Sequence, residues 1–168
     1  MLLLLNFIRL KHLILCSIPK KVRNMDETDQ KILEILKKDA RTPLSHISEE
    51  IGLSSPSIKD RITKMETDGV ILGYRPILDY GKLGLPLTAF INLRLHYPLC
   101  CTDQFIEQIH GIDEVIEGHY TDGEDDMVLK VVASEPSHLQ QILLKVNSLP
   151  GVASSSSIIS LTNPIRQR

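Results

Sequence analysis

Between residues 25 and 69, apolar residues recur with the spacing of three short helices. The first helix is expected to start at an Asp26 cap and to end near Lys38, because a carboxylate is favourable at a helix N-terminus. The second is expected to start at a Thr42 cap with Pro43 in its first turn and to stop at Gly52. The side chains expected to face inward are Ile32, Leu33, Ile35 and Leu36 in the first helix, and Leu44, Ile47 and Ile51 in the second.

The third helix follows after a short turn. Ser55 is expected to cap it, Pro56 to occupy its first turn and Gly69 to end it. Residues 70–72 and 73–77 are then expected to form a strand pair, or wing, around a glycine turn. Two helices joined by a tight turn and followed by a wing predict a winged helix-turn-helix, and the same pattern also fits any small helical bundle. The inward stripe of the third helix is Ile58, Ile62 and Met65.

The polar face of the third helix favours DNA over the bundle alternative. Small hydroxyls and cations remain exposed once the apolar stripe is removed, and these suit phosphate contacts and base-edge readout in a major groove. Residues 25–75 contain eight basic and ten acidic side chains, so attraction to DNA must come from local patches or from several subunits. The exposed set is Ser55, Ser57, Lys59, Asp60, Thr63 and Lys64, with Arg61 near its edge.

After a connector at 78–87, strands alternate with helices. Residues 88–96 alternate strictly, with Ala89, Ile91, Leu93 and Leu95 on one face. The order βαββαβ predicts a ferredoxin-like antiparallel sheet with helices on one face, and therefore an α+β chain. The uncovered face of such a sheet favours dimerisation through it. The expected strands are 88–96, 115–121, 127–133 and 152–161, and the expected helices are 102–110, with Phe105, Ile106 and Ile109 inward, and 137–148.

Composition narrows the class of protein. Hydrophobic residues make up 42% of the chain and charged residues 24%, which excludes wholesale disorder. Aromatic content is 4% with no Trp, which argues against a carbohydrate binder. Three cysteines and six histidines without metal-ligand spacing predict a reducing, cytoplasmic compartment and no metal or other cofactor.

Residues 1–24 differ from the rest. They contain five Lys or Arg and no acidic residue, and their apolar run is too short and too charged to span a bilayer. The positive charge falls within and after the apolar run, unlike in a signal peptide. We expect an over-called start codon, with translation beginning at Met25. A helix that packs on the body, and a basic arm through Lys20, Lys21 and Arg23, remain alternatives.

A series of short motifs runs through residues 25–161. In the N-terminal half they are MDETDQKIL at 25–33, KDAR at 38–41, IGLSSPS at 51–57, Arg61 with Ile62, Met65 with Glu66, and GVILGY at 69–74. In the C-terminal half they are KLG at 82–84, Gly123-x-x-Asp126 with MVLKVV at 127–132, and LPGV at 149–152. In order and spacing the series resembles the Lrp/AsnC (feast/famine) family of transcription regulators.

This resemblance implies a sequence-specific DNA-binding regulator. Its domains would be a winged helix-turn-helix at 25–77, a linker at 78–87 and an effector-binding, oligomerising domain at 88–161, with a tail at 162–168 and a non-family extension at 1–24. The implied partners are double-stranded DNA, a small effector such as an amino acid, and further copies of the chain as a homodimer and higher oligomers, with no membrane. The implied DNA-binding residues are Ser54, Ser55, Pro56, Ser57, Lys59, Asp60, Arg61, Thr63 and Lys64.

The resemblance places the effector near the acidic turn after the second strand. Gly123 permits a positive φ, and the carboxylates around it suit an ammonium group, with Asp126 at the motif position. The alternative is a merely solvated hairpin turn. The serine run at 154–157 departs from the family, because it lacks the arginine often found after the last Gly-Val. The candidate residues are Thr121, Asp122, Gly123, Glu124, Asp125 and Asp126.

Two other classes of function are alternatives to a DNA-binding regulator. Sirohaem decarboxylases resemble these regulators in both domains, but they carry an I-R-R-I-G-A-like wing where this chain has ILGYRP at 71–76. The sequence shows no nucleophile–base constellation, so an enzyme is not expected. A purely structural partner protein is disfavoured by the exposed serines, lysines and threonine of the third helix.

Overall fold

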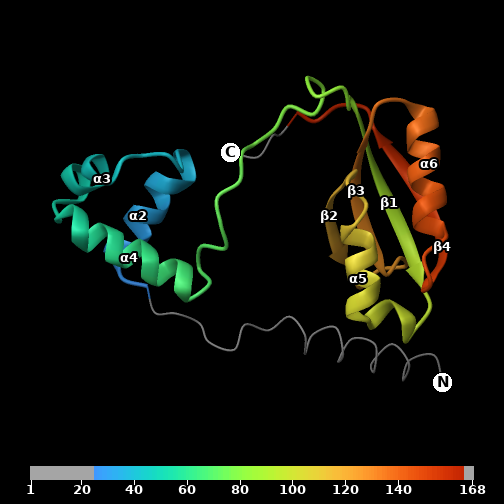
Figure 1. The fold of residues 1–168 in the computed structure, drawn as a ribbon, viewed down its shortest axis with the longest axis horizontal. Coiled ribbons are helices and arrows are strands. Elements are labelled where there is room, and N and C mark those ends of the chain that lie inside the picture. The colour runs from blue at the N-terminus through green and yellow to red at the C-terminus, as the bar shows by residue number, and fades with distance from the viewer. Residues whose placement is uncertain (1–24, 165–168) are drawn as a thin grey trace. The chain divides into compact units, whose positions relative to one another are not determined.

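The computed structural model describes residues 25–164, so the expectations for residues 1–24 and 165–168 lie outside it. The described chain divides into two compact units between Ile77 and Leu78, and both are drawn in Figure 1. Within residues 25–164, no helix has both the length and the apolar character that crossing a membrane requires.

The N-terminal unit contains three helices, as predicted. They are α2 (Glu27–Lys38), α3 (Leu44–Ile51) and α4 (Ser55–Thr67). Their core has four fully buried side chains, with one each from α2 and α3 and two from α4, so that every helix packs on the other two. The four are Ile32, Ile47, Ile58 and Met65.

Three details of this unit differ from the expectation. Leu44 is 36% exposed rather than buried, because it stands at the first position of α3, before the helix reaches the core. Pro43, and not Thr42, is the cap residue of α3. The cap of α4 is Ser54 rather than Ser55, since the Ser54 hydroxyl accepts the backbone N–H of Ser57.

The turn between α3 and α4 is set by a glycine in the left-handed region. Gly52 has a φ of 79°, a conformation that costs a side-chain-bearing residue about 1–2 kcal/mol. Its N–H donates to the carbonyl of Ser48 at 2.9 Å, and the Ser48 hydroxyl donates to the carbonyl of Leu53. These bonds close α3 and fix the short connection from which α4 starts.

The strand pair expected at 70–77 is not formed, and no strand is assigned between α4 and residue 87. The N–H groups of Val70 and Ile71 both donate to the Met65 carbonyl, at 2.8 and 3.1 Å. These donors therefore bond to a carbonyl at the end of α4 and not to the carbonyls of a neighbouring strand. Pro76 has no N–H to offer a ladder, and a two-stranded hairpin is marginal by itself.

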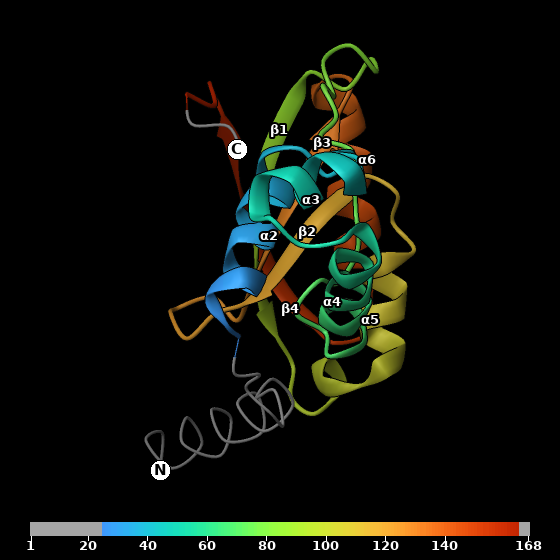
Figure 2. The ribbon, with the colours of Figure 1, turned by 90° about the vertical axis from the view of Figure 1, so that its left-hand side faces the viewer.

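The C-terminal unit has the predicted βαββαβ order and a four-stranded antiparallel sheet with the strand order β2-β3-β1-β4. Helices α5 and α6 pack on the same side of it, as the views in Figures 1 and 2 show. The fold class predicted from the sequence is confirmed. The elements are β1 (Leu87–Leu95), a short 3-10 helix η1 (Leu99–Cys101), α5 (Asp103–His110), β2 (Val115–Tyr120), β3 (Met127–Ala133), α6 (Pro136–Asn147) and β4 (Val152–Ser160).

The alternating strand β1 determines the two faces of the sheet. Its predicted inward residues are all buried against the helices, and Phe105 of α5 and Ile142 of α6 pack in the same core. Ile106 was expected to face inward but is 42% exposed, because α5 turns only Phe105 and Ile109 to the sheet. On the other face Phe90 lies opposite Ile158 of the edge strand β4, and both side chains are partly exposed.

Candidate nucleic-acid interface and effector turn

Helix α4 presents most of the predicted DNA-binding residues to solvent. Lys59 and Lys64 are exposed, and neither forms an ion pair with another residue of the described chain. Both ammonium groups are therefore available to an anionic partner. The other exposed members of the set are Ser54, Pro56, Asp60 and Thr63, while Ser55, Ser57 and Arg61 are half-buried.

Arg61 differs from the other cations of α4 because its charge is already paired. Its Nη1 atom lies 2.6 Å from Oδ2 of Asp26 and 2.8 Å from Oδ1 of Asp29. Asp26 also caps α2 by accepting the Asp29 N–H at 2.8 Å, and this bond, followed by the one from Arg61, holds the pKa of Asp26 below its usual value. The sequence gives no local signal for this cluster, because Arg61 stands more than thirty positions after the two aspartates.

The predicted effector turn is closed by its own hydrogen bonds. The Thr121 N–H donates to the Asp126 carbonyl at 2.9 Å, and the Thr121 hydroxyl donates to the Asp125 carbonyl at 2.6 Å. Gly123 permits a positive φ but does not adopt one. The bonds across the base of the turn bring β2 and β3 together without a left-handed residue.

Asp126 anchors this turn to β1. Its N–H donates to the Leu93 carbonyl and its Oδ2 accepts the Leu95 N–H, both at 2.7 Å. The pairing of β1 with β4 shifts register between Arg94 and Leu95. On its other edge β1 pairs regularly with β3 as far as Leu93 opposite Met127. Asp126, which precedes Met127, supplies a side-chain acceptor to β1 just beyond the end of that ladder.

The carboxylates of the turn have a cation beside them. The Arg94 guanidinium on β1 lies 3.9 Å from Glu124 and 3.7 Å from Asp125, and Asp122 is exposed. An incoming ammonium would therefore share the Glu124 and Asp125 carboxylates with Arg94. The structure gathers the predicted residues in one turn, and their contact with an effector stays a prediction.

A polar cluster that sequence reasoning missed joins the start of α6 to the chain before β2. The Ser134 N–H donates to Nδ1 of His138 at 3.2 Å, which leaves the proton on Nε2 for a 3.0 Å bond to Glu114. Lys145 lies 3.6 Å from the same carboxylate oxygen, and the His138 bond is the main reason that the pKa of Glu114 lies below its usual value. Because His138 stands in the first turn of α6 and accepts an N–H that precedes the helix, we interpret the cluster as a helix cap.

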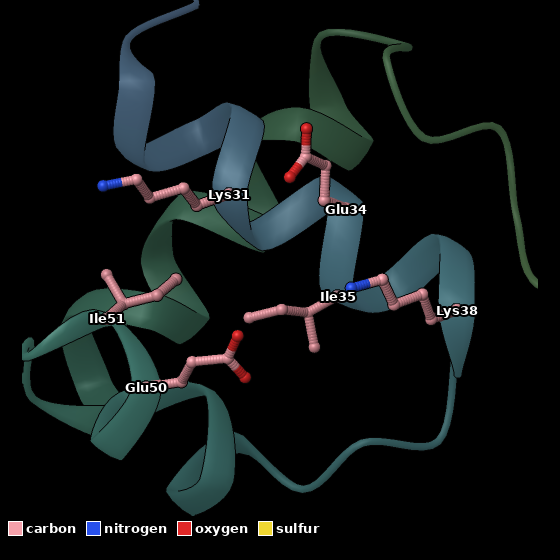
Figure 3. A pocket seen from close by; sticks show the side chains of 6 residues that line it. All are labelled: Lys31, Glu34, Ile35, Lys38, Glu50 and Ile51. Carbon is pink, nitrogen blue, oxygen red and sulfur yellow. The ribbon is translucent and has the colours of Figure 1, made fainter.

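A shallow hollow of about 290 Å³ lies between α2 and α3, as Figure 3 shows. Two isoleucines line it together with charged side chains of both signs. No residue predicted to bind DNA or an effector lines it, and its lining favours no particular ligand. The lining residues are Lys31, Glu34, Ile35, Lys38, Glu50 and Ile51.

Comparisons with known proteins cover both units. Residues 25–66 match the AsnC-type helix-turn-helix domain, and residues 88–168 match the Lrp/AsnC ligand binding domain. Regulatory protein AsnC of Haemophilus influenzae is 35% identical over 145 residues, which are 86% of this chain and 96% of that protein. The proline dehydrogenase transcriptional activator of Rhizobium radiobacter is 33% identical over 141 residues, covering 83% and 90%. The solved structure of E. coli AsnC superposes with a TM-score of 0.75 at 29% identity, covering 87% of this chain and 98% of that one.

The anchoring role of Asp126 can be measured without any ligand. We expect Asp126→Ala to lower the free energy of unfolding of the C-terminal unit by about 1–3 kcal/mol, because it leaves the Leu95 N–H without its acceptor. Asp122→Ala, in the same turn but exposed, is the matched control and should change it by less than about 0.5 kcal/mol. Urea unfolding followed by circular dichroism measures both. Equal stability of the two variants would contradict the anchor.

Proposed function

The chain belongs to the Lrp/AsnC family of transcriptional regulators, and from this premise we propose that α4 reads duplex DNA while the C-terminal unit couples that binding to an amino-acid effector. The observation that carries the proposal is the polar face of α4. It begins at a capped, glycine-defined turn, presents Lys59 and Lys64 unpaired among the described residues, and lies opposite the buried Ile58 and Met65.

Each exposed group on α4 has a definite use on DNA. Lys59 and Lys64 would neutralise phosphates, which contributes affinity but no sequence information. The exposed Thr63 hydroxyl and the Asp60 carboxylate would meet base edges, where hydroxyls accept or donate and a carboxylate accepts from cytosine. We propose no enzymatic role, since the relatives named above are regulators.

The effector would bind at the turn formed by residues 121–126. Asp122 and Glu124 are exposed, and their charges suit an α-ammonium group. One relative is named an activator of proline dehydrogenase transcription, which supports an amino acid as the class of effector. A ligand shared between subunits would bias their arrangement, and the usual scale of such coupling is about 1–3 kcal/mol.

Assembly would use the sheet face that α5 and α6 leave uncovered. Phe90 and Ile158 lie opposite one another across β1 and β4, 37% and 59% exposed, where a second copy can bury them. A two-fold dimer presents two α4 helices, so its operator should be a rough palindrome with half-sites about one helical turn apart or a multiple of it. Larger homo-oligomers would repeat this dimer, and the assembly would act on DNA in the cytoplasm.

The phosphate contacts predict a change in salt dependence. We expect the double variant Lys59→Ala, Lys64→Ala to bind the operator more weakly, with a slope of log K against log salt smaller by about two. Fluorescence anisotropy with duplex DNA at several salt concentrations measures the slope. Lys31→Ala, which removes a cation from α2, is the control and should keep the wild-type slope. A double variant that binds like the wild type at every salt concentration would show that α4 does not face the DNA backbone.

The effector proposal predicts heat and reciprocity in calorimetry. One or more of the twenty amino acids should bind to the protein. If the amino acid changes the affinity of the protein for operator DNA by some factor, operator DNA should change the affinity of the protein for the amino acid by the same factor. Asp126→Asn keeps an oxygen for the Leu95 N–H but removes the charge, so it should lose most of the response while binding DNA nearly as before. Asp113→Asn, an exposed acid outside the turn, is the control. No heat from any amino acid, with DNA affinity unchanged, would leave a regulator without this class of effector.

The assembly proposal predicts that the full chain is at least a dimer at micromolar concentration. Phe90→Asp combined with Ile158→Asp should shift the mass from light scattering toward the 18.9 kDa of one chain, because two charges would enter the buried contact. Leu144→Asp changes a side chain on α6 that is 65% exposed, and it should leave the mass of the assembly unchanged. A wild-type monomer, or an unaltered oligomer in the double variant, would rule out this interface.

A further inference from the structure

We infer that Arg61 acts on DNA recognition without touching DNA: it fixes the orientation of α4 against α2 by pairing with Asp26 and Asp29. Arg61 is then a positioning residue, although the sequence grouped it with the phosphate-binding cations of the same helix. This inference deepens the proposed function and rests on it, because it assumes that α4 reads the DNA.

The position of Arg61 along α4 turns it toward the core side of the helix. It stands three residues after Ile58 and four before Met65, and both of these side chains are fully buried. Residues three and four apart share a helix face. Arg61 is accordingly half-buried, while Lys59 and Lys64 are exposed.

One of the two partners of Arg61 is buried, and the other is exposed but held by a second bond. Asp29 is 2% exposed, and its Oδ1 lies 2.8 Å from Nη1 of Arg61. Asp26, 2.6 Å from the same nitrogen, is also held by its capping bond to the Asp29 N–H. If the guanidinium turned away toward a phosphate, the buried Asp29 carboxylate would lose its ion pair with Arg61, and losing an ion pair is costly in a desolvated site.

The bonds from Arg61 add a direction that the apolar core does not have. Four fully buried side chains and eight partly buried ones hold the three helices together, and apolar burial has no preferred direction. Charge-assisted hydrogen bonds are short and directional. The two bonds from Arg61 therefore fix how α4 is rotated relative to the start of α2. The rotation decides which side chains of α4 reach the base edges.

The effect of removing the Asp29 charge has opposite signs under the two roles. If Arg61 binds phosphate, Asp29→Asn frees it and removes a negative charge near the DNA, and both changes strengthen binding. If Arg61 positions α4, the same substitution loosens the helix and weakens binding to the preferred sequence. Non-specific binding, which depends on exposed cations, then changes little.

The test uses the full chain, an operator selected by the wild type and a scrambled duplex of equal length. Affinities are measured at several salt concentrations and at a temperature where circular dichroism shows each variant folded. The variants are Asp29→Asn, Arg61→Met, their combination and Arg61→Lys. Glu34→Gln, which removes an exposed carboxylate from the same helix, controls for net charge.

We expect Arg61→Met to lower the preference for the operator over scrambled DNA roughly tenfold, the value of one charge-assisted hydrogen bond, with an unchanged salt slope. Asp29→Asn should lower it in the same direction and add nothing to Arg61→Met in the combined variant. Arg61→Lys should restore part of the preference, because a lysine still pairs with the two carboxylates. Glu34→Gln should bind like the wild type.

Two results would overturn the inference. A salt slope reduced by about one in Arg61→Met, with Asp29→Asn as tight as the wild type or tighter, would make Arg61 a phosphate contact. Variants that unfold at lower temperature but keep the wild-type preference when folded would make the ion pairs structural only. Both results can be distinguished from a failure of the proposed function. In that case the wild type itself would bind operator and scrambled DNA equally, and the inference about Arg61 would lose its basis.

Discussion

Helices α2 and α3 hold α4 in place through one shared apolar core, which buries the inward face of α4. Ile58 and Met65 are fully buried in it, and the opposite face, with Lys59 and Lys64, is the one that we propose binds DNA. The contact of Arg61 with Asp26 and Asp29 adds direction to this packing. The orientation of α4 therefore depends on three features: the turn at Gly52, the cap at Ser54 and the carboxylates at the start of α2.

The C-terminal unit is arranged around β1 in a comparable way. β1 pairs with both β3 and β4, buries one face under α5 and α6, and has Phe90 on the other, where we propose that a second copy of the chain binds. Asp126 ties the acidic turn to the irregular end of this strand. A ligand at the turn would therefore act on the strand that also carries the proposed interface, and this continuity is the physical basis for the coupling we propose.

The sequence predicted elements better than contacts. Helical spacing and alternation identify the five α-helices and the four strands of residues 25–164, because burial of one face imposes those periods on the chain. The predicted wing at 70–77 is not formed, because the N–H groups of Val70 and Ile71 donate to the Met65 carbonyl at the end of α4. The apolar pattern of the sequence does not show that these donors have this alternative acceptor. Three contacts join residues far apart in sequence, so no local pattern predicts them: the pairs of Arg61, the bond between His138 and Glu114, and the bond from Leu95 to Asp126. The residue type of Arg61 alone predicts a contact with DNA phosphate. Its position on the core side of α4 indicates instead that it positions the helix.

We propose that α4, presented by a symmetric dimer, reads a defined duplex sequence under the control of an amino acid. Selection of bound DNA from a random duplex library by the full chain, with and without each amino acid, is the direct test of this proposal. We expect enrichment of one roughly palindromic motif, with at least one amino acid changing the yield of the motif or the spacing of its half-sites. Sequences bound no better than the starting library, under every condition, would contradict it.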